Sequence, residues 1–292
     1  MKEEVLSHIK TVQGNPQNIR AKMNKEDIVY QRKMGRNLHI RFVYPQQDSA
    51  SDSKKWPLVM HIQGSAWLDQ NLNDHLLDLK SIIEAGYILA IVEYYPVPKA
   101  IFPSQIEDAK LAMQYIVQHA NEHQVDTENL FLSGDSSGGY VALMSWATWN
   151  TNELSINKLK LPTIRAVIDL YGVVDITTLH EQNPTGGHHK LNGPECLMLG
   201  GNLEINPEIG NGVSVLPYIR KEIDSVPLLI MHGNKDERVP IEQSIQLYSY
   251  CLKMGKTVEF YQVKEGKHGL SAFYSKDVLQ VIVDFLNNHL KK

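Results

Sequence analysis

Residues 130–140 read Leu-Phe-Leu-Ser-Gly-Asp-Ser-Ser-Gly-Gly-Tyr. Gly134 to Gly138 form a G-x-S-x-G motif, which follows a strand-like apolar run and precedes a helix-like one. This order predicts a nucleophile elbow, a turn so sharp that only glycine fits on either side of an exposed Ser136. The alternatives are a glycine-rich surface loop and a phosphate-binding turn. A phosphate loop requires a lysine beside its glycines, and this stretch has none.

Composition narrows the class of protein. The chain has 292 residues, of which 42% are hydrophobic and 21% charged, as in one large or two small globular domains. A formal net charge of −4 without a Lys/Arg cluster argues against a nucleic-acid partner. Cys196 and Cys251 lie far apart, so we expect no metal site, no disulfide and a reducing compartment. No run has the length of a membrane span or of a signal-peptide core, so we expect a cytoplasmic protein without a membrane partner.

Strand-like and helix-like segments alternate along the chain after an N-terminal hairpin. Eight strands are predicted, at residues 27–30, 38–44, 57–62, 87–94, 129–132, 164–171, 226–232 and 257–263. Helices are predicted between and after them, at residues 76–85, 103–119, 140–146, 241–254 and 277–290. The alternation predicts an α/β fold, a mostly parallel eight-stranded sheet with helices on both faces. Its functional site is expected at the carboxyl ends of the strands.

Two segments depart from this alternation. Residues 1–25 are polar and weakly periodic, and we expect a short helix or an N-terminal arm on the surface. Residues 173–217 are rich in Gly, Pro, Asn and Glu, with a helical piece around Pro194–Leu199. So long an irregular stretch inside a compact domain predicts a lid or pocket wall. Because neither an internal repeat nor an interdomain linker is visible, we interpret residues 1–292 as a single domain.

A serine nucleophile needs a histidine base held by a carboxylate, and after an elbow the chain order is Ser, acid, His. His268 is the favoured base because it lies between glycines in a loop after the last strand. The other histidines after Ser136 are His180, His188, His189, His232 and His289. His232 is interpreted as a packed strand residue. The adjacent pair His188 and His189 is compatible with a metal pair, but a solvated loop is favoured.

Asp236 is the favoured acid, because it follows a buried strand and precedes His268 by one helix and one strand. A simple turn-forming Asp is the alternative, and Asp169, Asp175 and Glu237 remain further candidates for the acid. The developing oxyanion needs N–H donors, which we expect from the backbones of Ser65, Ala66 and Ser137. A plain strand-to-helix turn is the alternative interpretation of the loop that begins at residue 63.

Four motifs in this order resemble the α/β-hydrolases of the hormone-sensitive-lipase and feruloyl/acetyl-esterase kind, over roughly residues 27–290. The sequence at 134–139 resembles the G-D-S-A-G-G elbow of that family, and 63–67 (Gln-Gly-Ser-Ala-Trp) lies where the family has H-G-G-G-W. Residues 102–108 are similar to its F-P-A-Q-x-x-D, and 232–240 to its H-G-x-x-D-x-x-V-P. The resemblance implies the α/β-hydrolase fold and the triad Ser136, Asp236 and His268. It also implies that 173–217 is a small cap, which suggests small substrates.

The loop at 63–67 departs from the family pattern. Gln63 replaces a histidine, and Ser65 and Ala66 replace glycines, so a positive φ at Ala66 would be strained. We expect Gln63, Gly64 and Trp67 to belong to the substrate pocket.

These observations predict a serine hydrolase that cleaves small, short-acyl carboxylic esters through an acyl-enzyme, without metal or organic cofactor. The partner expected is a small-molecule ester; edge strands could also pair in a homodimer. Two alternatives remain open: a peptidase or amidase of the prolyl-oligopeptidase kind, and a non-catalytic hydrolase-like binding protein.

Overall fold

The computed structural model describes residues 10, 12–48, 51, 53–151, 153–155, 159–183 and 193–291. In this part of the chain a single sheet contains nine strands: β1 (Arg20–Met23), β2 (Ile28–Lys33), β3 (Arg36–Gln46), β4 (Trp56–Ile62), β5 (Ile88–Val92), β6 (Val125–Asp135), β7 (Ala166–Leu170), β8 (Leu228–Gly233) and β9 (Val258–Val263). The strand order is β1-β3-β5-β4-β6-β7-β8-β9, and β2 pairs with β3. All pairings from β5 to β9 are parallel, which brings the carboxyl ends of these strands to one edge.

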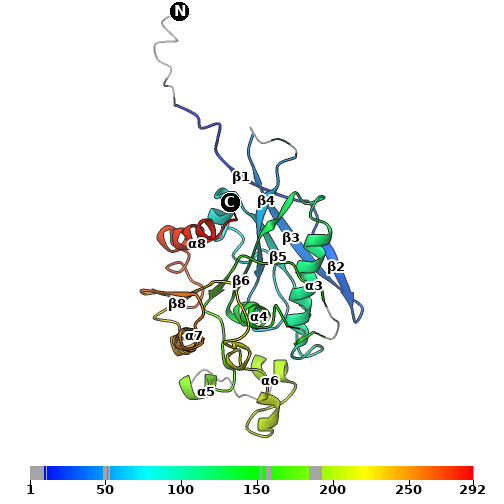
Figure 1. Cartoon of the computed structure of the whole chain (residues 1–292), viewed down its shortest axis with the longest axis vertical. Coiled ribbons are helices and arrows are strands. Elements are labelled where there is room, and N and C mark those ends of the chain that lie inside the picture. Colours follow the sequence, from blue (N-terminus) through cyan, green and yellow to red (C-terminus); the bar gives the residue numbers. More distant parts are fainter. Residues whose placement is uncertain are drawn as a thin grey trace, which may run out of the picture.

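Helices cover both faces of the sheet, as predicted. One face carries α3 (Ser104–Gln118), α4 (Ser136–Ala147) and α7 (Ile241–Lys253), and the other carries α2 (Lys80–Glu84) and α8 (Lys276–Asn288). Figure 1 shows α8 and α3 on opposite sides of the sheet. The central strands are buried on both faces and are therefore apolar along their whole length; all five residues of β5 are buried.

The sheet has one strand more than the eight predicted. Residues 20–23, expected to belong to a surface arm or short helix, form β1, which pairs antiparallel with β3 at the edge of the sheet. All four residues of β1 are exposed, so backbone hydrogen bonds hold the strand and no apolar alternation marks it.

The predicted irregular insertion is present between β7 and β8. Its described part contains short helices: α5 (Leu179–Gln182), α6 (Pro194–Leu199) and the 3-10 turns η1 (Pro207–Gly210) and η2 (Leu216–Tyr218). In Figure 1, α5 and α6 lie at the bottom of the molecule, far from the chain's C-terminus. The insertion begins directly after β7, so it starts at the edge of the sheet where the parallel strands end.

Candidate active site

The turn from β6 into α4 has the geometry of a nucleophile elbow. Ser136 has a φ of +52°, which is strained for a residue with a side chain. A Cβ at Gly134 would lie 2.3 Å from the carbonyl oxygen of Gly138, and one at Gly138 would lie 2.0 Å from that of Ile62. Glycine is therefore required at both positions, and the chain can turn sharply enough to expose the Ser136 hydroxyl.

Ser136, His268 and Asp236 are joined by hydrogen bonds. His268 Nε2 lies 2.8 Å from Ser136 Oγ, and His268 Nδ1 lies 2.7 Å from Asp236 Oδ2. A carboxylate only accepts, so Nδ1 carries the proton of the neutral ring and Nε2 accepts from the serine hydroxyl. The imidazole is thus in the tautomer that can take the serine proton.

Asp236 is fixed by more groups than His268 alone. The backbone N–H groups of Arg238 and Val239 donate to its Oδ1 at 2.8 and 3.0 Å. Burial alone would raise the pKa of Asp236, but hydrogen bonds from His232 and His268 outweigh it and hold this pKa far below its ordinary value. The carboxylate therefore stays ionised.

His232 is buried and packed, as expected for a strand residue. Its Nε2–H donates to the carbonyl oxygen of Val239 at 2.9 Å, and its Nδ1 accepts from the hydroxyl of Ser244 at 2.7 Å. Its Nε2 also lies 3.4 Å from Asp236 Oδ2. It supports the turn that carries the acid and does not contact the nucleophile.

The remaining candidates lie outside this constellation. Asp169 is buried in β7, where its Oδ1 accepts the N–H of Gly172. Asp175 accepts from Thr177 within the insertion. Glu237 has an exposed side chain and lies on the cavity wall. The histidines weighed against His268 are placed as follows: His289 ends α8, His180 lies in α5, and His188 and His189 lie outside the described residues.

The loop after β4 folds directly over the elbow. Gly64 N–H donates to Asp135 Oδ1 at 2.9 Å, and a Cβ at Gly64 would lie 2.6 Å from the Asp135 carbonyl oxygen. Ser65 N–H donates to Ser137 Oγ at 2.9 Å, so this predicted oxyanion donor already has an acceptor. No acceptor is found for the Ala66 N–H among the described residues, and the Ser137 N–H lies in the first turn of α4, where N–H groups have no partner within the helix. Ala66 has a φ of +53°, the strained conformation expected if its backbone keeps the positive φ of the glycine that the family has at this position.

A cavity of about 760 Å³ opens at this point. Ser136, His268 and the 64–68 loop form its floor, and the insertion contributes Pro194 and Glu195. Gly64 and Trp67, two of the residues expected in the substrate pocket, line this cavity, although the Trp67 side chain is only 2% exposed and packs edge-on against Tyr140. Gln63 differs from its prediction, because its side chain is 1% exposed beneath the loop and is not part of the cavity wall.

Sequence reasoning missed several aromatic residues around the base. The ring of Tyr171 meets the His268 ring edge-on at 4.7 Å, and its hydroxyl hydrogen-bonds that of Tyr274 at 2.6 Å. His75 packs on Tyr274 and also lines the cavity. Only Tyr171 carried a usable signal, since it directly follows a central strand at the carboxyl edge of the sheet.

The sequence matches a known protein family. The family model BD-FAE matches residues 45–251, which is more than half of the chain. The chain belongs to the BD-FAE family. This match confirms the predicted resemblance to esterases of the α/β-hydrolase superfamily.

Individual relatives are esterases of low sequence identity. Esterase LipQ of Mycobacterium tuberculosis (strain ATCC 25618 / H37Rv) is 24% identical over 242 residues, 80% of this chain and 55% of LipQ. The probable carboxylic ester hydrolase LipM of the same organism is 26% identical over 193 residues, 64% of this chain and 43% of LipM. The chain thus spans about half the length of the curated relatives it matches. A truncated carbohydrate esterase from gut microbiota shares the fold, with a TM-score of 0.76, 21% identity, and coverage of 94% of this chain and 98% of that one.

The described residues include neither a metal-type cluster nor a membrane-spanning helix. No three His, Cys, Asp or Glu side chains in the described ranges come together in a way that could hold a metal ion. Within the same ranges, every helix is too short or too polar to cross a bilayer.

Proposed function

We propose that this BD-FAE chain is a serine hydrolase of carboxylic esters. The observation that carries the proposal is the hydrogen-bonded series Ser136–His268–Asp236 at the floor of a 760 Å³ cavity. The esterase relatives support the same reaction class. The cavity lies with His268 and Ser136 at the carboxyl ends of the strands, which is where α/β sheets bind their ligands.

In this proposal His268 removes the proton of Ser136 as its oxygen attacks the ester carbonyl. His268 then gives that proton to the departing alcohol, which leaves an acyl group on Ser136. His268 then takes a proton from water as the water oxygen attacks the acyl carbon, and it returns that proton to Ser136 Oγ as the acyl–oxygen bond to Ser136 breaks and the acid leaves. Asp236 accepts the Nδ1–H of His268 throughout, so it keeps the tautomer and stabilises the imidazolium that forms.

For the oxyanion, we propose the N–H groups of Ala66 and Ser137 as the principal donors. No acceptor is found for the Ala66 N–H among the described residues, the Ser137 N–H lies in the first turn of α4, where N–H groups have no partner within the helix, and both residues line the cavity. Ser65 would join them only by giving up its bond to Ser137 Oγ. A lost donor of this kind typically costs about 2.7–4 kcal/mol of transition-state stabilisation.

For the substrate, we propose small esters with short acyl groups, because the insertion closes one side of the cavity through Pro194 and Glu195. As part of the proposal, we also retain the single domain, the cytoplasmic setting and the option of a homodimer. Both cysteines are free and buried, which fits a reducing compartment.

The test combines turnover with labelling of the nucleophile. Wild type, Ser136→Ala and His268→Ala are assayed on p-nitrophenyl esters of increasing acyl length, then treated with a fluorophosphonate probe and mapped by peptide mass. We expect wild type to hydrolyse the short esters best and to carry one adduct on Ser136. Both variants should lose turnover, and Ser136→Ala should lose the adduct. His289→Ala, on the terminal helix, is the matched histidine control and should behave as wild type.

The same assays separate the alternatives. Retained turnover in Ser136→Ala would sink the serine mechanism. Faster cleavage of a dipeptide amide than of any ester would favour the peptidase or amidase reading. A folded protein that binds small carboxylic ligands yet never reacts with the phosphonate would favour a binding protein.

A further inference from the structure

The loop at residues 63–70 is strained at two positions that glycine would occupy more easily than the residues present. Ala66 and Trp67 have φ values of +53° and +58°, a region that residues with side chains rarely adopt. Two consecutive residues of this kind persist only where surrounding contacts fix them.

The Ser137 side chain lies at the centre of the loop. Its Oγ accepts the N–H of Ser65 at 2.9 Å and the N–H of Trp67 at 3.2 Å. These two bonds occupy both lone pairs of the hydroxyl oxygen. The Ser137 hydroxyl proton must therefore go elsewhere, and the Tyr94 hydroxyl oxygen lies 3.3 Å away.

The Tyr94 hydroxyl in turn donates a hydrogen bond to the loop, at Ser65. Ser65 Oγ lies 2.7 Å from the carbonyl oxygen of Leu68, which can only accept, so the Ser65 proton points there. Ser65 Oγ is then the acceptor for the Tyr94 hydroxyl at 2.9 Å. One direction of donation thus runs from Ser137 through Tyr94 and Ser65 to Leu68. Burial raises the pKa of Tyr94 to about 12, so its hydroxyl keeps its proton at neutral pH.

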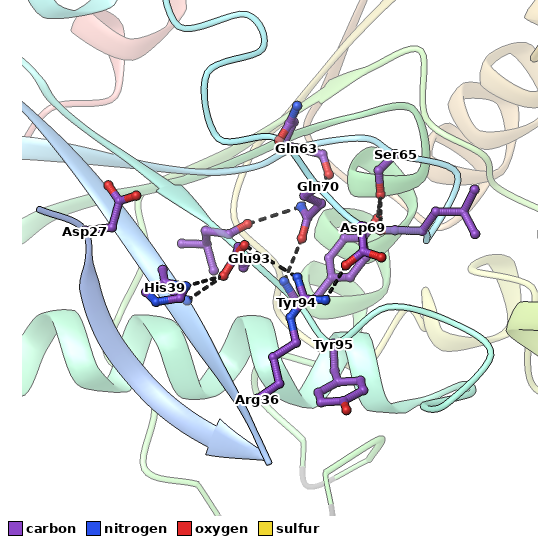
Figure 2. Close-up of polar contacts among 12 residues, drawn as sticks. Asp27, Arg36, His39, Gln63, Ser65, Asp69, Gln70, Glu93, Tyr94 and Tyr95 are labelled. Carbon is purple, nitrogen blue, oxygen red and sulfur yellow. Dashed lines mark hydrogen bonds and ion pairs between the residues drawn. The ribbon is translucent and has the colours of Figure 1, made fainter. Parts of the chain in front are cut away.

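The backbone of Tyr94 is fixed as well. Gln70, at the far end of the loop, accepts the Tyr94 N–H at 2.8 Å and donates to the Gln63 carbonyl oxygen at 2.8 Å. It thereby joins the end of β4 to the segment after β5. Figure 2 shows Gln70 between Gln63 and Tyr94, with Asp69 beside it in contact with Arg36 of β3.

We propose that Tyr94 is a positioning residue for the oxyanion loop. Its hydroxyl, acting through Ser137 and Ser65, holds Ala66 and Trp67 in the left-handed conformation that glycines would otherwise adopt. The Ser137 side chain is the acceptor around which this loop folds, a role separate from that of its backbone N–H. The catalytic meaning of this inference rests on the proposed function, and its structural content does not.

Kinetics test the catalytic part with a matched pair of variants. Tyr94→Phe removes the connecting hydroxyl, and Tyr95→Phe removes a buried hydroxyl from the next residue, whose bond runs to Met34 at the β2–β3 turn. We expect Tyr94→Phe to lower kcat on a short p-nitrophenyl ester about 10- to 100-fold with KM within about twofold, since misplaced groups cost up to about 100-fold. Tyr95→Phe should stay near wild type. Ser137→Ala should lower kcat similarly, and Tyr94→Phe with Ser137→Ala should cost little more than either alone.

Amide hydrogen exchange tests the structural part without any turnover. Tyr94→Phe and Ser137→Ala should each speed exchange of the Ser65 and Trp67 amides at least tenfold, while Tyr95→Phe leaves them unchanged. Unchanged exchange in both variants would overturn the inference, even if kcat falls. Faster exchange in a wild-type background that hydrolyses no ester would uphold the positioning role and reject the proposed function.

Discussion

Asp236 makes contacts through both of its carboxylate oxygens, and this decides what an amide would do there. Its Oδ1 accepts two backbone N–H groups, and its Oδ2 accepts from His268. In Asp236→Asn the amide oxygen must keep the Oδ1 position, so the NH₂ group faces His268 Nδ1. Nδ1 then becomes an acceptor, and the ring proton moves to Nε2, opposite Ser136. We expect kcat on a short ester to fall about 10⁴-fold, as measured by steady-state turnover.

Glu237→Gln is the control for this substitution, since the side chain is one residue away and 83% exposed. A loss of comparable size in Glu237→Gln, or its absence in Asp236→Asn, would show that the acid has been misassigned.

At the scale of residues, chain order was enough to name three side chains that the structure joins by hydrogen bonds, and it could not name the groups around them. Ser136, Asp236 and His268 could be chosen because an elbow enzyme presents them in that order after named strands. Tyr94 and Gln70 could not, because their roles arise from hydroxyl and amide contacts across β4, β5 and α4. Such contacts leave no period or spacing in the sequence.

The end of β7 carries a buried acid that makes folding depend on pH. Burial raises the pKa of Asp169 to about 8, above the roughly 3.9 of an unfolded chain, although Gly172 N–H donates to it. Between these values the folded state keeps a proton that the unfolded state releases, so stability falls as pH rises. The slope is at most about 1.4 kcal/mol per pH unit.

Asp169→Asn should remove this dependence while its amide oxygen still accepts from Gly172. We expect urea unfolding to give similar stabilities near pH 5 and an advantage for the variant that grows toward pH 7.5. Parallel stability curves for the two proteins across that range would contradict a protonated Asp169.

At the scale of elements, the apolar pattern of the sequence predicted the helices whose side chains are buried in the core. The helix predicted over residues 103–119 is α3, Ser104–Gln118, and the helical piece within the insertion is α6, Pro194–Leu199. The helix predicted over 76–85 is shorter, because His75 takes a φ of +57° and turns occupy the residues before α2. β1 was missed because all four of its residues are exposed and no apolar alternation marks them; the strand is held by its backbone pairing with β3 and by the ion pair of Arg20 with Asp48.

The whole molecule is a sheet with one large insertion, and several hydrogen bonds join the described part of the insertion to the body. The side-chain oxygen of Gln243 on α7 accepts the N–H groups of Val174 and Asp175. Phe102 N–H, before α3, donates to the Met198 carbonyl oxygen at 2.9 Å. Tyr140, fully buried on α4, donates its hydroxyl to the Val213 carbonyl oxygen at 2.9 Å. Tyr140 also packs against Trp67, so α4, the loop that carries Trp67 and the insertion meet at this side chain.

Removal of that hydroxyl should weaken the attachment of the insertion. In Tyr140→Phe the buried carbonyl of Val213 loses its donor, which typically costs about 1–3 kcal/mol of unfolding free energy. Tyr218→Phe is the matched control, because its hydroxyl bonds the Gly212 carbonyl oxygen at the same 2.9 Å on an exposed surface within the insertion. We expect urea denaturation to give a loss of that size for Tyr140→Phe and under about 0.5 kcal/mol for Tyr218→Phe. Equal losses would mean that the bond on α4 does not couple the insertion to the body, and that other contacts, such as the hydrogen bonds of Gln243 on α7 to Val174 and Asp175, hold it over the cavity.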